Sequence, residues 1–165
     1  MQNSKPKKKN NPPKKSVIFV CTGNTCRSPM AENILRDVLK KRGTLSYYNV
    51  KSAGLAAEVG LDMSPNAKAA LEHFGIKPKK HAARQLTLRS AKNACLIVCM
   101  TQRHKQAIGL PSCETVAEIC GGNDVPDPYG GPVELYISTA EYLRYAAEDI
   151  ADLLEKRFSP TVGNN

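Results

Sequence analysis

The chain alternates between short, fully apolar runs and longer stretches in which apolar residues recur at helical spacing. Residues 17–20 (VIFV) and 94–100 (ACLIVCM) are continuous apolar runs. A short run without polar alternation is typical of a strand that is buried on both faces, as in a parallel sheet. Residues 49–54 predict another short strand that enters a Gly turn, and residues 115–119 predict a weaker fourth strand.

Amphipathic stretches predict four helices, over residues 29–42, 65–74, 102–108 and 132–157. Ser-Pro pairs begin the first two, with Ser28 and Ser64 as the expected N-caps, and a glycine ends each of them. Thr101 is the expected cap of the third helix, and the fourth carries a long apolar stripe. Because strands and helices alternate, we expect an α/β fold, a three-layer α/β/α arrangement around a small, four-stranded parallel sheet.

The composition is that of a single globular domain. The chain has 165 residues, of which 41% are hydrophobic and 24% are charged. No apolar run approaches the roughly 20 residues that span a bilayer, so we expect neither a membrane segment nor a secretion signal. Six cysteines without regular spacing favour a reducing compartment over a disulfide framework, and we therefore expect a cytoplasmic protein.

The first fifteen residues (MQNSKPKKKNNPPKK) differ from the rest of the chain. Their six lysines supply most of the net charge of +9, so the remainder is only modestly basic. We expect residues 1–15 to be a disordered basic tail, 16–158 to be one domain and 159–165 to be a frayed C-terminus. Beyond disorder, the tail has a second interpretation, as an electrostatic handle for nucleic acid or another acidic partner.

The stretch that joins the first strand to the first helix carries the candidate chemistry. Cys21 ends the strand, and Arg27 follows six residues later, after a loop that contains Gly23 and Asn24. These two residues tolerate a positive φ, which a tight bend requires. A loop over a helix N-terminus directs backbone N–H groups to one spot, where the helix dipole adds partial positive charge. Such a nest suits a dianionic phosphate.

The side chains of this loop suit phosphoryl transfer. Arg27 offers a planar fork for two phosphate oxygens. The positive field favours the thiolate form of Cys21, which is a nucleophile for phosphorus, and Ser28 can donate its hydroxyl to that thiolate. The residues expected to bind the substrate are Thr22, Gly23, Asn24, Thr25, Cys26, Ser28 and Tyr129.

Residues 21–32 (CTGNTCRSPMAE) resemble the phosphate-binding loop of the low-molecular-weight protein tyrosine phosphatase family. Residues 125–131 (VPDPYGG) resemble the loop of that family that holds the general acid, and the resemblance extends from about residue 16 to 158. It implies that Cys21 is the nucleophile and forms a phosphocysteine, that Arg27 binds the phosphoryl group and that Asp127 is the general acid. It implies phosphorylated proteins as partners and no metal or cofactor. Residues 81–86 resemble the segment that packs beneath the active-site loop.

The resemblance extends to the substrate. Tyrosine phosphatases of the family usually carry a bulky aliphatic residue where Thr25 stands, and Thr25 resembles the bacterial protein-arginine phosphatase branch. Residues 100–106 and 127–131 also resemble that branch. We therefore expect phosphoarginine as the substrate, with phosphotyrosine as the alternative. A non-catalytic phosphate-binding module is a further alternative, which the presence of Cys21, Arg27 and Asp127 disfavours.

Three further cysteines and two of the three histidines are interpreted as having no part in the phosphoryl transfer itself. Thioredoxin-coupled arsenate reductases, a more distant alternative, use a resolving cysteine pair, but Cys113 and Cys120 lie around the wrong strand and are interpreted as structural. Cys26 is expected to form a reversible disulfide with Cys21. His73 and His81 are interpreted as helix-dipole partners or solvent-facing residues, because nothing around them has zinc-like spacing.

Overall fold

The computed structural model describes residues 12–158, so most of the basic tail and residues 159–165 lie outside the described residues. Its centre is a four-stranded sheet with the strand order β2-β1-β3-β4, in which every neighbouring pair is parallel. The strands are β1 (Lys15–Cys21), β2 (Tyr48–Gly54), β3 (Leu96–Cys99) and β4 (Cys113–Thr115). This arrangement confirms the predicted four-stranded parallel sheet.

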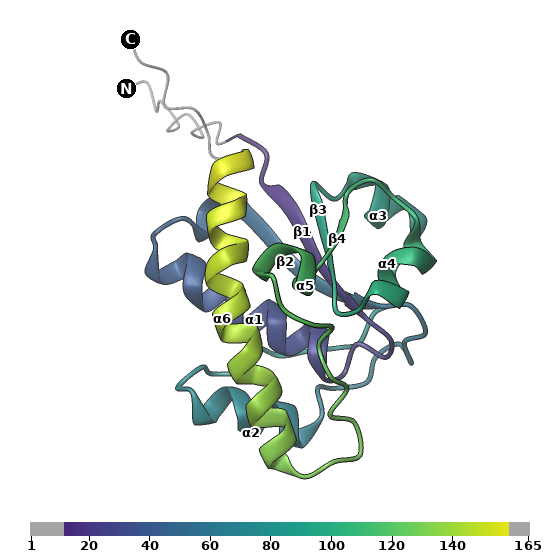
Figure 1. Ribbon diagram of the computed structural model, residues 1–165, viewed down its shortest axis with the longest axis vertical. Coiled ribbons are helices and arrows are strands. Elements are labelled where there is room, and N and C mark those ends of the chain that lie inside the picture. Colours follow the sequence, from purple (N-terminus) through teal and green to yellow (C-terminus); the bar gives the residue numbers. More distant parts are fainter. Residues whose placement is uncertain (1–11, 159–165) are drawn as a thin grey trace, which may run out of the picture.

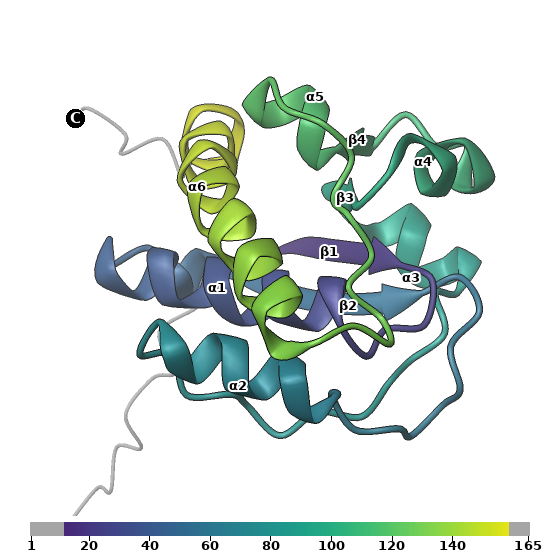
Figure 2. The same ribbon diagram turned by 60° about the horizontal axis from the view of Figure 1, so that its bottom comes forward.

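Helices cover both faces of the sheet (Figures 1 and 2). The elements of one layer are α1 (Arg27–Lys41), α2 (Pro65–His73), α5 (Val116–Cys120) and α6 (Val133–Phe158). Those of the other layer are α3 (Leu88–Asn93) and α4 (Gln102–Ile108). A short 3₁₀ helix, η1 (Leu45–Tyr47), leads into β2. The predicted three-layer α/β/α class is therefore confirmed.

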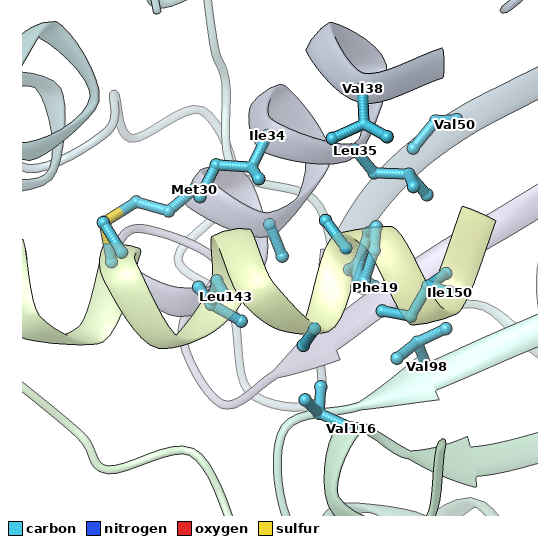
Figure 3. Close-up of a cluster of buried hydrophobic side chains, with 14 of the residues drawn as sticks. Phe19, Met30, Ile34, Leu35, Val38, Val50, Val98, Val116, Leu143 and Ile150 are labelled. Atoms are coloured by element: carbon cyan, nitrogen blue, oxygen red, sulfur yellow. The ribbon is translucent and has the colours of Figure 1, made fainter. Parts of the chain in front are cut away.

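The two hydrophobic cores follow from the alternation of side chains along the strands. In β1, Phe19 points into the larger core and packs with α1 and α6, whereas Ile18 points into the smaller core beneath α3. Figure 3 shows Leu35 of α1 and Leu143 and Ile150 of α6 gathered around Phe19 in the larger core. Since β1 is apolar at every position that it buries, its sequence shows no alternation, as expected for a central parallel strand.

Two local predictions were wrong. Residues 115–119 were expected to form a strand, but β4 ends at Thr115 and the following residues form α5. The physical reason is a capping box, in which the Thr115 side chain accepts from the Glu118 backbone and the Glu118 side chain accepts from the Thr115 backbone. Ser28 was expected to cap α1, but the helix begins at Arg27, so the N-cap position falls on Cys26, whose side chain makes no capping bond.

Within residues 12–158, no helix is long and apolar enough to cross a membrane.

All four strands end at the same edge of the sheet, because all of them are parallel. The loop that follows β1 and the segment between α5 and α6 meet beyond this edge (Figure 2). The carboxyl edge is where ligands bind in open α/β sheets, so the candidate site is sought there.

Candidate active site

The loop over residues 22–26 bends sharply at Asn24, which has a left-handed φ of 58°. Its side chain stabilises that conformation, because its Nδ2 donates to Ser28 Oγ (2.9 Å) and its Oδ1 accepts from the Arg84 backbone N–H (2.9 Å). The His81 Nε2 donates to the Asn24 carbonyl oxygen (2.7 Å). The positive φ expected at Asn24 is confirmed, whereas Gly23 does not need one. His81 was interpreted as a dipole partner or solvent-facing residue, which was wrong, since it holds this loop.

Ser28 lies beneath the sulfur of Cys21. Its Oγ accepts from Asn24 Nδ2, so its own hydrogen can go to Cys21 Sγ (2.9 Å) or to the Ala53 carbonyl oxygen (3.5 Å), of which the sulfur is the nearer. Both residues are buried, which means that little water competes for this bond. The predicted contact between the Ser28 hydroxyl and the sulfur is confirmed, and the same contact explains why Ser28 does not cap α1.

Arg27 connects the loop after β1 to the segment between α5 and α6. It is only 6% exposed, and one guanidinium nitrogen donates to the Val125 carbonyl oxygen (3.1 Å). The other lies 3.4 Å from Asp127 Oδ2. The second carboxylate oxygen of Asp127 accepts from the Tyr129 backbone N–H (3.2 Å), while the side chain remains 54% exposed. Arg27 therefore brings Asp127, a hundred residues away in sequence, to the loop of Cys21.

These residues enclose one cavity of about 230 Å³. The residues that line it are Cys21, Thr22, Gly23, Asn24, Thr25, Cys26, Arg27, Asp127 and Tyr129. The structure thus brings together every predicted site residue, with Ser28 directly beneath. A cavity lined by a buried guanidinium and, beside it, an exposed carboxylate suits a small anion that is attached to a larger, solvent-facing group.

Cys26 contacts α6 and the N-cap residue of α2. Its sulfur lies 3.5 Å from Ser64 Oγ and 3.6 Å from the Tyr136 hydroxyl. Burial, together with this contact, raises the pKa of Tyr136. The six cysteines are free thiols in the structure, so the disulfide between Cys21 and Cys26 stays a prediction.

The other cysteines have separate surroundings. Burial raises the pKa of Cys99 and that of its neighbour Cys113, which favours the thiol form of both. Cys120 instead contacts the hydroxyl of Tyr142 (3.5 Å). Nothing in these contacts joins Cys113 to Cys120 as a working pair.

Sequence reasoning missed two supports of the loop besides His81. Gly54, at the end of β2, lies against the loop, and the next two backbone N–H groups donate to the carbonyl oxygens of Cys21 (3.0 Å) and Thr22 (2.9 Å). His104 of α4 contacts the Thr22 hydroxyl. Residues 81–86 were expected beneath the loop from the family resemblance, and the contacts of His81 and Arg84 place this segment there.

One protein family matches nearly all of the described residues. The family described as low molecular weight phosphotyrosine protein phosphatase matches residues 16–159. The chain belongs to this family. The match covers the sheet, its helices and both loops of the cavity, which confirms the expected family.

The relatives of this chain within the family include protein-arginine phosphatases and protein-tyrosine phosphatases. A protein-arginine-phosphatase of Bacillus subtilis is 35% identical over 85% of this chain and 97% of its own length. A YwlE arginine phosphatase, a variant with a phosphorylated serine in place of the active-site cysteine, superimposes with a TM-score of 0.80 at 35% identity, over 87% of this chain and 97% of that one. A low molecular weight protein tyrosine phosphatase of T. tengcongensis gives a TM-score of 0.79 at 37% identity, over 85% of this chain and 99% of that one.

Proposed function

We propose that this protein hydrolyses phosphorylated residues of proteins through a phosphocysteine intermediate. The Cys21 thiolate attacks phosphorus, so that a sulfur–phosphorus bond forms while the bond to the leaving group breaks. Arg27 and the loop N–H groups balance the charge on the equatorial oxygens. Asp127 gives its proton to the leaving group and then takes one from the water that hydrolyses the phosphocysteine.

The observation that carries this proposal is the convergence of Cys21, Arg27 and Asp127 on one cavity. The phosphorylated serine at the active-site position of the YwlE variant supports a covalent phosphoenzyme. An arsenate reductase is disfavoured, because Cys113 and Cys120 have different partners. The mechanism requires no metal or cofactor, and a thiolate nucleophile fits the cytoplasm. A role of the basic tail in binding acidic partners stays a prediction.

We propose phosphoarginine as the preferred substrate. The support is Thr25, which lines the cavity and has its hydroxyl 3.7 Å from Cys26 Sγ, together with the protein-arginine-phosphatase relative from Bacillus subtilis. A polar side chain of this size suits a guanidinium better than it suits an aromatic ring. Phosphotyrosine is the second candidate, because the tyrosine phosphatase from T. tengcongensis is equally similar to this chain.

The substrate is tested by measuring kcat/KM on phosphoarginine and phosphotyrosine peptides for the wild type, Thr25→Ile and Thr25→Val. We expect the wild type to prefer phosphoarginine, and Thr25→Ile to shift the ratio toward phosphotyrosine by about 10- to 100-fold, since one methylene in a pocket is worth roughly that factor. Thr25→Val changes polarity at nearly constant size, so it separates the two causes of any shift. Cys21→Ser should abolish turnover of both peptides. A wild type that prefers phosphotyrosine would contradict the arginine assignment but not the phosphatase mechanism.

A further inference from the structure

One buried histidine joins the loop over residues 22–26, the phosphate loop, to the helical layer that contains α3 and α4. His104, in the first turn of α4, is only 7% exposed. Its Nε2 lies 2.9 Å from Thr22 Oγ1, and its Nδ1 lies 3.0 Å from Thr101 Oγ1. Both ring nitrogens are therefore occupied by threonine hydroxyls, and Thr22 is the residue that directly follows Cys21.

The N-cap role of Thr101 favours one direction for these contacts. Thr101 Oγ1 accepts the His104 backbone N–H (3.2 Å) as the N-cap of α4, and we infer that it uses its own hydrogen to donate to His104 Nδ1. Nε2 then carries the ring proton and donates it to Thr22 Oγ1. Burial and the nearby charge of Arg27 lower the pKa of His104, which is consistent with a neutral ring that has one donor and one acceptor.

Thr22 is held at two points. Its carbonyl oxygen accepts from the Ala56 backbone N–H (2.9 Å), and its hydroxyl oxygen accepts from His104. Once that oxygen accepts from the ring, the hydroxyl hydrogen of Thr22 is the part that remains free. Since Thr22 is exposed and lines the cavity, this hydrogen can reach a ligand there.

We propose that His104 is a positioning residue of the active site. It fixes the Thr22 side chain and the adjacent loop backbone, and it turns the Thr22 hydroxyl hydrogen toward an oxygen of the bound phosphoryl group. The proposal rests on the proposed function only in that the cavity binds a phosphoryl group. It does not depend on which phosphorylated residue is the substrate.

Two amide variants test the proposal, because each preserves one ring nitrogen. The amide nitrogen of His104→Gln reaches about as far as Nε2 and can still donate to Thr22, whereas the amide of His104→Asn replaces Nδ1 and cannot. The readouts are kcat/KM on a generic aryl phosphate and the inhibition constant of inorganic phosphate. We expect His104→Asn to worsen both by about tenfold, the usual effect of one hydrogen bond, and His104→Gln to stay within about threefold of the wild type.

Thr22 provides the matched controls at the exposed end of the contact. Thr22→Ser keeps the hydroxyl and should weaken phosphate binding less than Thr22→Val does, whereas Thr22→Val should weaken it by about as much as His104→Asn does. In the Thr22→Val background, His104→Asn should cause no further loss, because the two changes remove one interaction. A purely structural histidine would instead give losses that add.

Several results would refute the positioning role of His104. Equal effects of His104→Asn and His104→Gln, or additive effects with Thr22→Val, would overturn the positioning role. If the histidine variants do not fold, Thr22→Val decides alone, and phosphate inhibition equal to that of the wild type would refute the proposal. A wild type that neither binds phosphate nor hydrolyses the aryl phosphate would refute the proposed function itself, and the role of His104 with it.

Discussion

At Gly54, the backbone of β2 passes the phosphate loop with no room for a side chain. A Cβ there would overlap the carbonyl oxygen of Thr22 and would lie 3.1 Å from the Asn24 backbone nitrogen. Both contacts are with backbone atoms, which cannot swing away as the end of a flexible side chain can. A glycine inside a strand often marks such a close approach of two backbones.

We therefore expect Gly54→Ala to displace the loop. The variant should lose about 1–3 kcal/mol of unfolding free energy, the usual cost of overpacking, and should lose activity as well. Gly23→Ala is the matched control for stability, because its Cβ would meet only Thr25 Oγ1, at 3.8 Å, and its φ is not positive. Urea unfolding of both variants measures the difference. Identical midpoints for the two would show that the loop yields without cost.

At the scale of single residues, the sequence could reveal only the site residues that belong to a local pattern. Cys21 and Arg27 share one loop, and Asp127 lies in a stiff turn between prolines, so each has neighbours that identify it. His81 and His104 lie in segments that the family resemblance singled out, residues 81–86 and 100–106, but no local pattern gives either side chain a role. They reach the loop from 57 and 82 residues away in sequence, and only the fold brings them there.

At the scale of elements, α1 and α6 are joined at the end of α1 by a network of charges around one arginine. Arg42 lies 2.5 Å from Glu148, 2.7 Å from Asp152 and 3.3 Å from Glu155, three acidic residues of α6. Hydrogen bonds to Glu148 and Asp152 raise the pKa of Arg42. Because one cation serves three carboxylates, its loss also leaves them to repel one another.

We expect Arg42→Met to lower the unfolding free energy by about 1–2 kcal/mol, the sum of several partly exposed pairs. Lys41→Met is the matched control, because within residues 12–158 Lys41 pairs with Asp37 of its own helix alone, and the change should cost under about 0.5 kcal/mol. Urea unfolding gives both values. The difference should shrink in about 1 M salt, which screens exposed charges. A salt-independent loss would instead indicate packing of the arginine stem.

Sequence pattern predicted the long elements better than the short ones. The stripe of α6 is repeated over several turns, so the pattern itself is strong evidence of a helix, and α6 is observed over Val133–Phe158. In residues 115–119, apolar and β-branched residues favoured a strand, but the reciprocal bonds of Thr115 and Glu118 start a helix instead. Residues 88–93 were not predicted to be helical, and Thr87 and Ser90 form a capping box there too. In short elements, a cap can outweigh propensity.

At the scale of the whole molecule, the site exists because a parallel sheet collects its loops at one edge. The loop after β1, the end of β2, the start of α4 and the segment before α6 all meet there (Figure 2). That edge could be predicted from alternating strands and helices alone. Which side chains then touch could not be predicted, because it depends on strand order and on the path of the loops. His104 shows this, since it joins α4 to a loop on the far side of β3.

This buried histidine also affects the stability of the whole molecule. Folding holds the pKa of His104 below its ordinary value of 6.5, first by burial and then by the charge of Arg27. Protons therefore bind more readily to the unfolded chain. The stability that depends on the neutral ring is complete above about pH 6.5 and is lost as the pH falls through the folded value. Asp124, Asp127 and Arg103 also act on the ring.

We expect the unfolding free energy of the wild type to fall more steeply between about pH 8 and pH 5 than that of His104→Gln, which cannot titrate there. Since the neighbouring charged groups are the same in both proteins, subtracting the two curves isolates the histidine. Urea unfolding at a series of pH values provides these curves. The difference should begin near the ordinary histidine pKa and grow toward acid. Parallel curves would mean that the folded protein accepts a charged His104 as readily as the unfolded chain does. That result would contradict the neutral His104 ring that donates to Thr22.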